Sequence, residues 1–189
     1  MAKTKSIKRE VVEWIILIGV VCLIYFAGWH TQLIGKLQQA VLATGIMQPD
    51  FVEEKVSADY SFSLTNMEGK LVPFSDFQND VVFLNFWATW CPPCIAEMPD
   101  IHELYKKQVK DISFVMVSLD KDRKKALEFV RKHEYKFPVY FLNSSLPKTY
   151  DVSSIPTTYV LGKDGLIKVK NHGMAKYSTE SFYKFLSEL

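Results

Sequence analysis

The sequence predicts an α/β fold in which helices flank a central sheet of mixed strand direction. Short apolar runs at 81–87 and 112–119, typical of strands buried on both faces, alternate with helical patterns at 91–107 and 121–133. This alternation predicts parallel strands joined by helices. Near the end of the chain, the runs TTYVL and LIKVK flank the turn GKDG, which predicts a hairpin that adds an antiparallel edge to the sheet.

Shorter patterns predict the remaining elements of the domain. Alternating residues at 60–64 and 70–73, on either side of a turn, predict an N-terminal β-hairpin extension ahead of the central strands. A further strand is expected at 139–142 and a short helix at 146–150. A closing helix is expected at 178–189.

An apolar run near the N-terminus has the length of a membrane span. Residues 11–29 contain one charge, Glu13, and carry Trp14 and Trp29 near their two ends. As a helix, this run is roughly 28 Å long, close to the thickness of a bilayer core. We therefore expect a single transmembrane helix, with a cleaved signal peptide as the alternative. The basic residues that precede the run predict a cytoplasmic N-terminus and an extracytoplasmic domain.

The chain is thus expected to have four parts. They are a basic cytoplasmic tail (1–10), a transmembrane anchor (11–29), a juxtamembrane helical spacer (30–49) and a single globular domain (50–189).

Charge excludes one class of partner. The formal net charge is +2, and the first thirteen residues hold all of it, with four basic and two acidic side chains. From Trp14 onward the basic and acidic residues balance. The globular domain therefore has no basic excess of the kind that nucleic-acid binding requires, and no nucleic-acid partner is expected.

The three cysteines raise the main functional question. Cys22 lies within the apolar run and is expected to have no redox role, whereas Cys91 and Cys94 form a C-x-x-C pair. Structural zinc usually needs four Cys or His ligands, and the four histidines are not paired at ligand spacing, so no metal site is expected. A permanent disulfide across so short a loop would remove little chain entropy. A redox-active pair is the remaining interpretation.

The position of the pair favours redox chemistry. It follows a buried strand and opens a helix, where unpaired backbone N–H groups and the helix dipole stabilise a thiolate. Cys91 is expected to cap the helix, to face outward and to act as the nucleophile. Cys94, one turn later, is expected to resolve the mixed disulfide. Pro92 suits the first helical turn because its missing N–H is not needed there.

Two separated motifs, FWATWCPPC and SSIPTTYVLGKDG, resemble those of the thioredoxin superfamily, and of membrane-anchored TlpA/ResA-type thiol–disulfide oxidoreductases in particular. The resemblance covers roughly residues 50–189. It implies a thioredoxin-like fold, a cis Pro156 beside the cysteine pair, and Ile155 backbone groups that pair with a substrate. It also implies a reductase of protein disulfides, acting in cytochrome c maturation, with electrons from a separate transmembrane donor. No cofactor is implied beyond the Cys91–Cys94 disulfide.

Three further residues are interpreted around the pair. Thioredoxin has a buried Asp where this chain has Asn85, and an amide cannot act as a base. Glu97 is then the nearest candidate proton acceptor for Cys94, although an acid favoured near the helix start by the dipole is an equal reading. Trp90 is expected to offer a flat apolar surface to substrates.

Other functions on the same fold stay open from the sequence. A thiol peroxidase usually has a Thr three residues before a lone Cys, whereas Thr89 stands two before Cys91. A copper-binding chaperone would need a ligand such as His172 to approach the cysteines. A redox-inert docking module would not need both cysteines.

Overall fold

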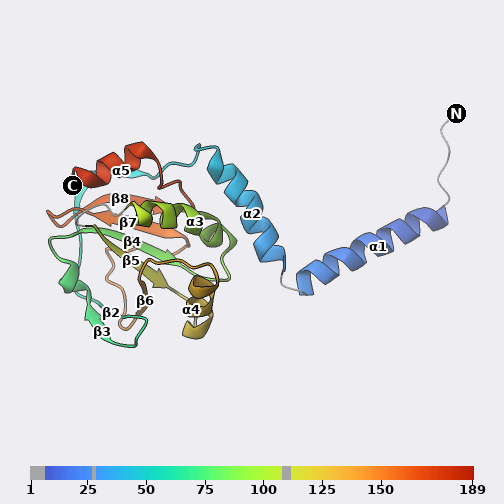
Figure 1. The fold of residues 1–189 in the computed structure, drawn as a ribbon, viewed down its shortest axis with the longest axis horizontal. Coiled ribbons are helices and arrows are strands. Elements are labelled where there is room, and N and C mark those ends of the chain that lie inside the picture. Colours follow the sequence, from blue (N-terminus) through green and yellow to red (C-terminus); the bar gives the residue numbers. More distant parts are fainter. Residues whose placement is uncertain (1–6, 27–28, 108–111) are drawn as a thin grey trace.

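The computed structural model describes residues 7–26, 29–107 and 112–189 (Figure 1). Eight strands form one mixed sheet in the order β1-β8-β7-β4-β5-β6-β2-β3. The strands are β1 (Phe51–Ser57), β2 (Ser63–Thr65), β3 (Leu71–Pro73), β4 (Val81–Trp87), β5 (Ile112–Ser118), β6 (Val139–Leu142), β7 (Thr157–Leu161) and β8 (Leu166–His172). The helices are α1 (Ile7–Phe26), α2 (Trp29–Ala43), η1 (Phe74–Phe77, a 3₁₀ turn), α3 (Pro92–Lys106), α4 (Arg123–Lys132) and α5 (Glu180–Ser187).

The mixed strand directions agree with the predicted class. Strands β4, β5 and β6 are parallel, and β7 runs antiparallel to β4. The predicted antiparallel hairpin is present as β7 and β8, but its position at an edge was wrong. Strand β1, which the sequence did not predict, pairs with β8 and forms that edge. Its run FVEEKVS carries three charged residues, which an edge strand tolerates but which hid it from a search for apolar alternation.

Most of the other elements match their predicted ranges. The N-terminal hairpin is β2 with β3, and it forms the opposite edge of the sheet by pairing with β6. The short helix expected at 146–150 was wrong, because these residues contain only one turn, at 148–149, where the Tyr150 N–H donates to the Pro147 carbonyl at 3.1 Å. Pro147 stands near the start of this segment, and proline pre-sets the backbone angle that turns use.

The central strand β4 divides the core into two layers. All seven of its residues are buried, and alternate side chains point to opposite faces of the sheet. Phe83 and Trp87 face the layer formed with α3, α4 and α5, whereas Leu84 and Phe86 face the layer that contains Phe74. Asn85 shares the parity of Phe83 and Trp87. The strand therefore directs this polar side chain toward α3, which carries the cysteine pair.

The two N-terminal helices precede the domain (Figure 1). Among the described residues, no helix combines the length and the apolar character needed to cross a bilayer, so the predicted anchor is not confirmed. The predicted spacer is largely helical, as α2, and it packs against α3. At the contact, a Cβ atom on Gly35 would lie 3.6 Å from the Pro92 carbonyl oxygen and 3.7 Å from Ile95. The spacer is thus part of the folded domain's surface.

Candidate active site

The cysteine pair occupies the start of α3, as predicted. Cys91 is the N-cap residue, and its Sγ accepts a hydrogen bond from the Cys94 backbone N–H at 3.2 Å. Pro92 and Pro93 fill the first two helical positions, where an N–H has no intrahelical partner. The two cysteines form a disulfide with a Cα–Cα distance of 5.3 Å. The amide-rich end of the helix therefore surrounds the sulfur that the sequence assigns as the nucleophile.

The expectation that Cys91 faces outward was wrong for this disulfide form. Cys91 is 4% exposed and Cys94 is fully buried. The Cys91 Sγ lies 3.6 Å from the Ile155 carbonyl oxygen, across a loop 64 residues further along the chain. The local sequence predicts that Cys91 caps α3, but the burial of its sulfur depends on a loop that is distant in the sequence. Only a small part of the Cys91 side chain is therefore in contact with solvent in this form.

The loop against the disulfide contains the expected proline. The Ile155–Pro156 peptide bond is cis, and Pro156 is buried. Thr157 holds the loop to β8, because its hydroxyl donates to the Ser154 carbonyl at 2.6 Å and its oxygen lies 3.1 Å from His172 Nδ1. The Pro156 carbonyl accepts from the Gly173 N–H at 2.8 Å. These bonds fix the backbone of Ile155 beside the sulfur.

The segment that leads into Cys91 is held by a buried aspartate that the sequence reading missed. Asp120 is 8% exposed and accepts from the Thr89 N–H at 3.0 Å and from its hydroxyl at 2.6 Å. Ser118 also donates to the same carboxylate, at 2.9 Å. The sequence could have indicated this contact. Asp120 follows β5, which is parallel to β4, and the carboxyl ends of neighbouring parallel strands lie at the same edge of a sheet. The hydroxyl of Thr89, two residues before Cys91, is therefore bound to the Asp120 carboxylate.

Trp90 lies on the surface next to this segment. It is 61% exposed, which agrees with the flat apolar surface predicted for it. Trp87, three residues earlier, is fully buried in the core.

Glu97 and Asn85, predicted separately, are in direct contact. Glu97 is fully buried in the second turn of α3, where Oε1 accepts from Asn85 Nδ2 at 2.9 Å and Oε2 accepts from the Ala175 N–H at 3.3 Å. Burial raises the pKa of Glu97 from 4.5 to about 8, against the opposing effect of these two hydrogen bonds. Its burial and its two hydrogen-bond partners set it apart from the exposed acids Glu103 and Glu180. A carboxyl with such a pKa can exchange protons near neutral pH.

A buried polar network extends from this pair and was not predicted. Asn85 Nδ2 also donates to Thr158 Oγ1 at 2.9 Å. The Tyr177 hydroxyl lies 3.4 Å from Asn171 Nδ2, and burial raises the pKa of Tyr177, with the nearby Glu97 as the next contribution. The network joins β4, α3, β7 and β8. Sequence patterns gave no signal for it, because a single Thr or Tyr in a strand region is usually a core or edge residue.

A copper-binding chaperone would need His172 as a ligand near the cysteines, but the contacts of its two ring nitrogens are with other groups. Its Nδ1 faces Thr157, and its Nε2 lies 4.0 Å from the Asp151 carboxylate. Within 7–26, 29–107 and 112–189, no group of three or more His, Cys, Asp or Glu side chains is arranged to hold a metal ion.

Known proteins match this chain over the domain just described. The Redoxin family model matches residues 47–184. The thiol-disulfide oxidoreductase ResA of Bacillus thuringiensis subsp. konkukian is 35% identical over 131 residues, 68% of this chain and 75% of the relative. The thioredoxin-like protein YneN of Bacillus subtilis is 30% identical over 159 residues, 82% of this chain and 87% of the relative.

A solved structure shares the fold. StoA from Bacillus subtilis aligns with a TM-score of 0.54 and 24% identity, and the alignment covers 67% of this chain and 93% of that one. The domain therefore has the thioredoxin-like arrangement of a mixed sheet flanked by helices.

Proposed function

Because this chain belongs to the Redoxin family, as a thiol–disulfide oxidoreductase of the ResA and TlpA type, we propose that its Cys91–Cys94 pair reduces protein disulfides outside the cytoplasm. One observation carries the proposal. The disulfide lies at the amide-rich start of α3 and against the Ile155–Pro156 loop, so a nucleophile, a resolving thiol and a substrate-binding backbone meet at one point.

The reaction is a two-electron exchange. In the reduced protein, the Cys91 thiolate attacks one sulfur of a substrate disulfide, that S–S bond breaks, and the other substrate sulfur leaves and takes a proton. Cys94 then loses its proton and attacks the Cys91 sulfur, which breaks the mixed disulfide and releases the second substrate thiol. The substrate gains two electrons and two protons, and the protein returns to the disulfide form.

Glu97 is proposed to take the proton of Cys94. It is three residues after Cys94 on the same helix and is fully buried, and with a pKa of about 8 the ionised fraction that can accept a proton grows as the pH rises toward 8. Asn85 orients its carboxyl group through the 2.9 Å hydrogen bond. In this proposal the amide of Asn85 positions the acid and does not itself accept the proton.

Substrate polypeptides are proposed to bind on three residues around Cys91. The exposed ring of Trp90 offers an apolar surface, and the backbone of Ile155 offers hydrogen-bonding groups to an extended chain. Pro156 fixes that backbone beside the sulfur and is itself buried. Of these three residues, Trp90 is exposed, Ile155 is half-buried and Pro156 is buried.

The location and the direction of electron flow are also part of the proposal. The apolar run 11–29, preceded by basic residues, supports a single anchor with the domain on the extracytoplasmic side. The resemblance to membrane-anchored reductases supports electron supply by a separate transmembrane donor and a role in cytochrome c maturation. A domain tied to the membrane would meet such a donor without free diffusion.

Trapping identifies the substrates and tests the pair's assigned roles. In a Cys22→Ser background, Cys94→Ala leaves Cys91 unable to be resolved, so partner proteins should accumulate as mixed disulfides that mass spectrometry identifies. Cys91→Ala is the matched control and should trap almost nothing.

Equal trapping by both variants would overturn the assignment of Cys91 as nucleophile. The direction is checked on the unmodified pair by equilibration in glutathione buffers. A reduction potential in the range of strong oxidants, about −120 mV, would reverse the proposed electron flow.

A further inference from the structure

A groove lies beside the redox site, between α2, α3 and α4. Its volume is about 420 Å³. The side chains that line it come from these three helices and from the segments that follow β4 and α4: Gly35, Lys36, Gln39, Thr89, Ile95, Pro99, Phe129, Lys132, His133 and Tyr135.

The groove begins close to the nucleophile. Thr89 stands two residues before Cys91, and the Ile95 N–H donates to the Cys91 carbonyl at 3.1 Å, one turn into α3. A polypeptide whose sulfur reaches Cys91 therefore has the residues next to its cysteine within reach of the groove.

One wall of the groove belongs to this chain's N-terminal segment. Helix α2 packs against α3 at Gly35, where a Cβ atom would already be in van der Waals contact with Pro92 and Ile95, so a side chain longer than that of alanine would press on both. This helix ends at Ala43, before the residues 47–184 that match the Redoxin family model. The wall that α2 supplies thus lies outside the residues that the family model matches, whereas the other walls lie within them.

The groove combines an apolar floor with a basic rim. Ile95, Pro99, Phe129 and Tyr135 supply apolar and aromatic surface. The exposed side chains of Lys36, on α2, and Lys132, on α4, supply two positive charges.

His133 Nδ1 lies 2.8 Å from the Phe129 carbonyl oxygen and donates a hydrogen to it, so this nitrogen is already engaged within the protein. Among the described residues that line the groove, none is acidic.

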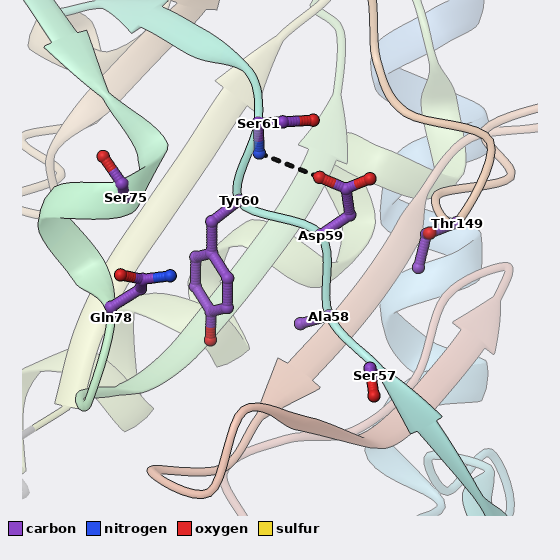
Figure 2. A pocket seen from close by; sticks show the side chains of 8 residues that line it. All are labelled: Ser57, Ala58, Asp59, Tyr60, Ser61, Ser75, Gln78 and Thr149. Atoms are coloured by element: carbon purple, nitrogen blue, oxygen red, sulfur yellow. Dashed lines mark hydrogen bonds between the residues drawn. The ribbon is translucent and has the colours of Figure 1, made fainter.

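Another hollow in the structure lacks such a pattern. It has a volume of about 520 Å³ and lies around Asp59 and Tyr60, with no residue of the redox site in its lining (Figure 2). Its one carboxylate is already engaged, since Asp59 accepts from the Ser61 N–H at 2.9 Å. The groove beside Cys91 therefore offers the stronger basis for recognition.

We propose that this groove is a specificity subsite that binds an acidic and aromatic segment next to the reactive cysteine of a protein substrate. The aromatic side chain lies on the apolar floor, and its acidic neighbour lies between Lys36 and Lys132. The proposal rests on the disulfide-reductase function and adds the class of substrate that this chain prefers.

A pair of model peptides tests the subsite. Both contain one intramolecular disulfide and have the same length and one Phe beside a cysteine, but one carries Glu and the other Lys at the flanking positions. The full chain, with Cys22→Ser, is reduced in detergent, and the second-order rate constant of peptide reduction is measured for each. The expected ratio favours the Glu peptide by about fivefold, the scale of two partly exposed charge contacts, and falls toward one at high salt.

Charge reversal identifies the groups responsible. The double variant Lys36→Glu/Lys132→Glu should invert the ratio, whereas Lys148→Glu, an exposed control in a distant loop, should keep it. Gly35→Leu, which displaces α2, should bring the ratio close to one. Circular dichroism and thermal melting show that each variant is folded.

Three outcomes separate the two proposals. Equal reduction of both peptides by the unmodified chain, or an unchanged ratio in the charge-reversed variant, overturns the subsite and leaves the reductase intact. Reduction of neither peptide overturns the reductase function itself.

Discussion

At the scale of single residues, the buried Glu97 is the group whose chemistry depends most on its surroundings. Burial keeps its carboxyl protonated up to about pH 8 in the folded protein, whereas the same group in an unfolded chain titrates near 4.5. The folded state therefore holds one more proton than the unfolded state between these two pH values. Both the reaction and the stability should depend on pH through this residue.

Glu97→Gln should remove an inflection near pH 8 from the pH dependence of the disulfide-exchange rate, since Gln resembles the protonated acid but cannot transfer a proton.

The same substitution tests how Glu97 affects the stability of the fold. In the unmodified protein the free energy of unfolding should fall as the pH rises from 4.5 to 8, by up to about 1.4 kcal/mol per pH unit from this group. Denaturant titrations at several pH values measure it.

The Glu97→Gln variant should lack this pH-dependent part of the free energy of unfolding. The difference in unfolding free energy between the two proteins, measured at each pH, therefore isolates the contribution of Glu97. A pH–rate profile that is identical in the two proteins would remove Glu97 from the mechanism. A difference in stability that does not change with pH would show that the carboxyl is ionised when folded.

The sequence indicates Asn85 and Glu97 as candidate site residues but does not predict the hydrogen bond between them. Asn85 was noted from its strand position and Glu97 from its distance to Cys94. Their hydrogen bond depends on which face of β4 meets α3, and this is set by packing across the whole sheet. The burial of Cys91 was missed for the same reason, because residue 155 provides the cover.

At the scale of elements, the segment between β4 and α3 depends on the end of β5. Asp120 accepts three hydrogen bonds, two from Thr89 and one from Ser118, and so ties the approach to Cys91 to the neighbouring strand. Parallel pairing of β4 with β5 brings these residues together. The position of the nucleophile thus depends on a residue about thirty positions later.

Asp120→Ala should destabilise the fold by about 3 kcal/mol, because the donors of Thr89 and Ser118 lose their buried acceptor. It should also slow alkylation of reduced Cys91, since the segment is no longer fixed. The nearby Asp122→Ala is the control. Asp122 caps α4 by accepting from the Lys124 N–H, so its loss should cost about 1 kcal/mol.

The alkylation rate of Asp122→Ala should match that of the unmodified protein. If Asp120→Ala also left the rate unchanged while lowering stability, Asp120 would be a structural residue without a role in positioning Cys91.

The elements themselves were largely predictable, because local patterns determine them. The range 81–87 was predicted for β4, and 139–142 for β6, from continuous apolar runs. Strand β1 could not be found in this way, since its pairing with β8 and not its own composition makes it a strand. The order of strands in the sheet likewise depends on contacts between distant segments.

At the scale of the whole molecule, the sheet has a separate hydrophobic core on each face, and only one of the two contains the redox site. The core on the α3 side contains both cysteines, and the other contains Phe62, Leu64 and Phe74 from the N-terminal hairpin region. Phe74 is fully buried and stacks on Phe62 with ring centroids 4.2 Å apart. The hairpin thus closes the face of the sheet that lies away from the redox site.

Phe74→Ala should lower the free energy of unfolding by about 3–5 kcal/mol, since it leaves a cavity in this core. Leu71→Ala, on the exposed side of the same hairpin, should change it by about 0.5 kcal/mol or less. Urea unfolding followed by circular dichroism measures both.

The folded Phe74→Ala protein should still exchange disulfides at the unmodified rate, because the sheet separates the two cores. A large loss of rate with the fold intact would show that the hairpin core supports the site directly.

Asn171 links the start of the globular domain to its buried polar interior. Its Oδ1 accepts from the Asp50 N–H at 3.3 Å, while its Nδ2 donates to the Gly173 carbonyl at 2.7 Å and lies near Tyr177 in the buried network. Asp50 follows the helices that lead to the N-terminus. One amide therefore joins the backbone just before β1 to the buried polar interior, so a substitution of Asn171 would loosen the start of the domain and the interior together.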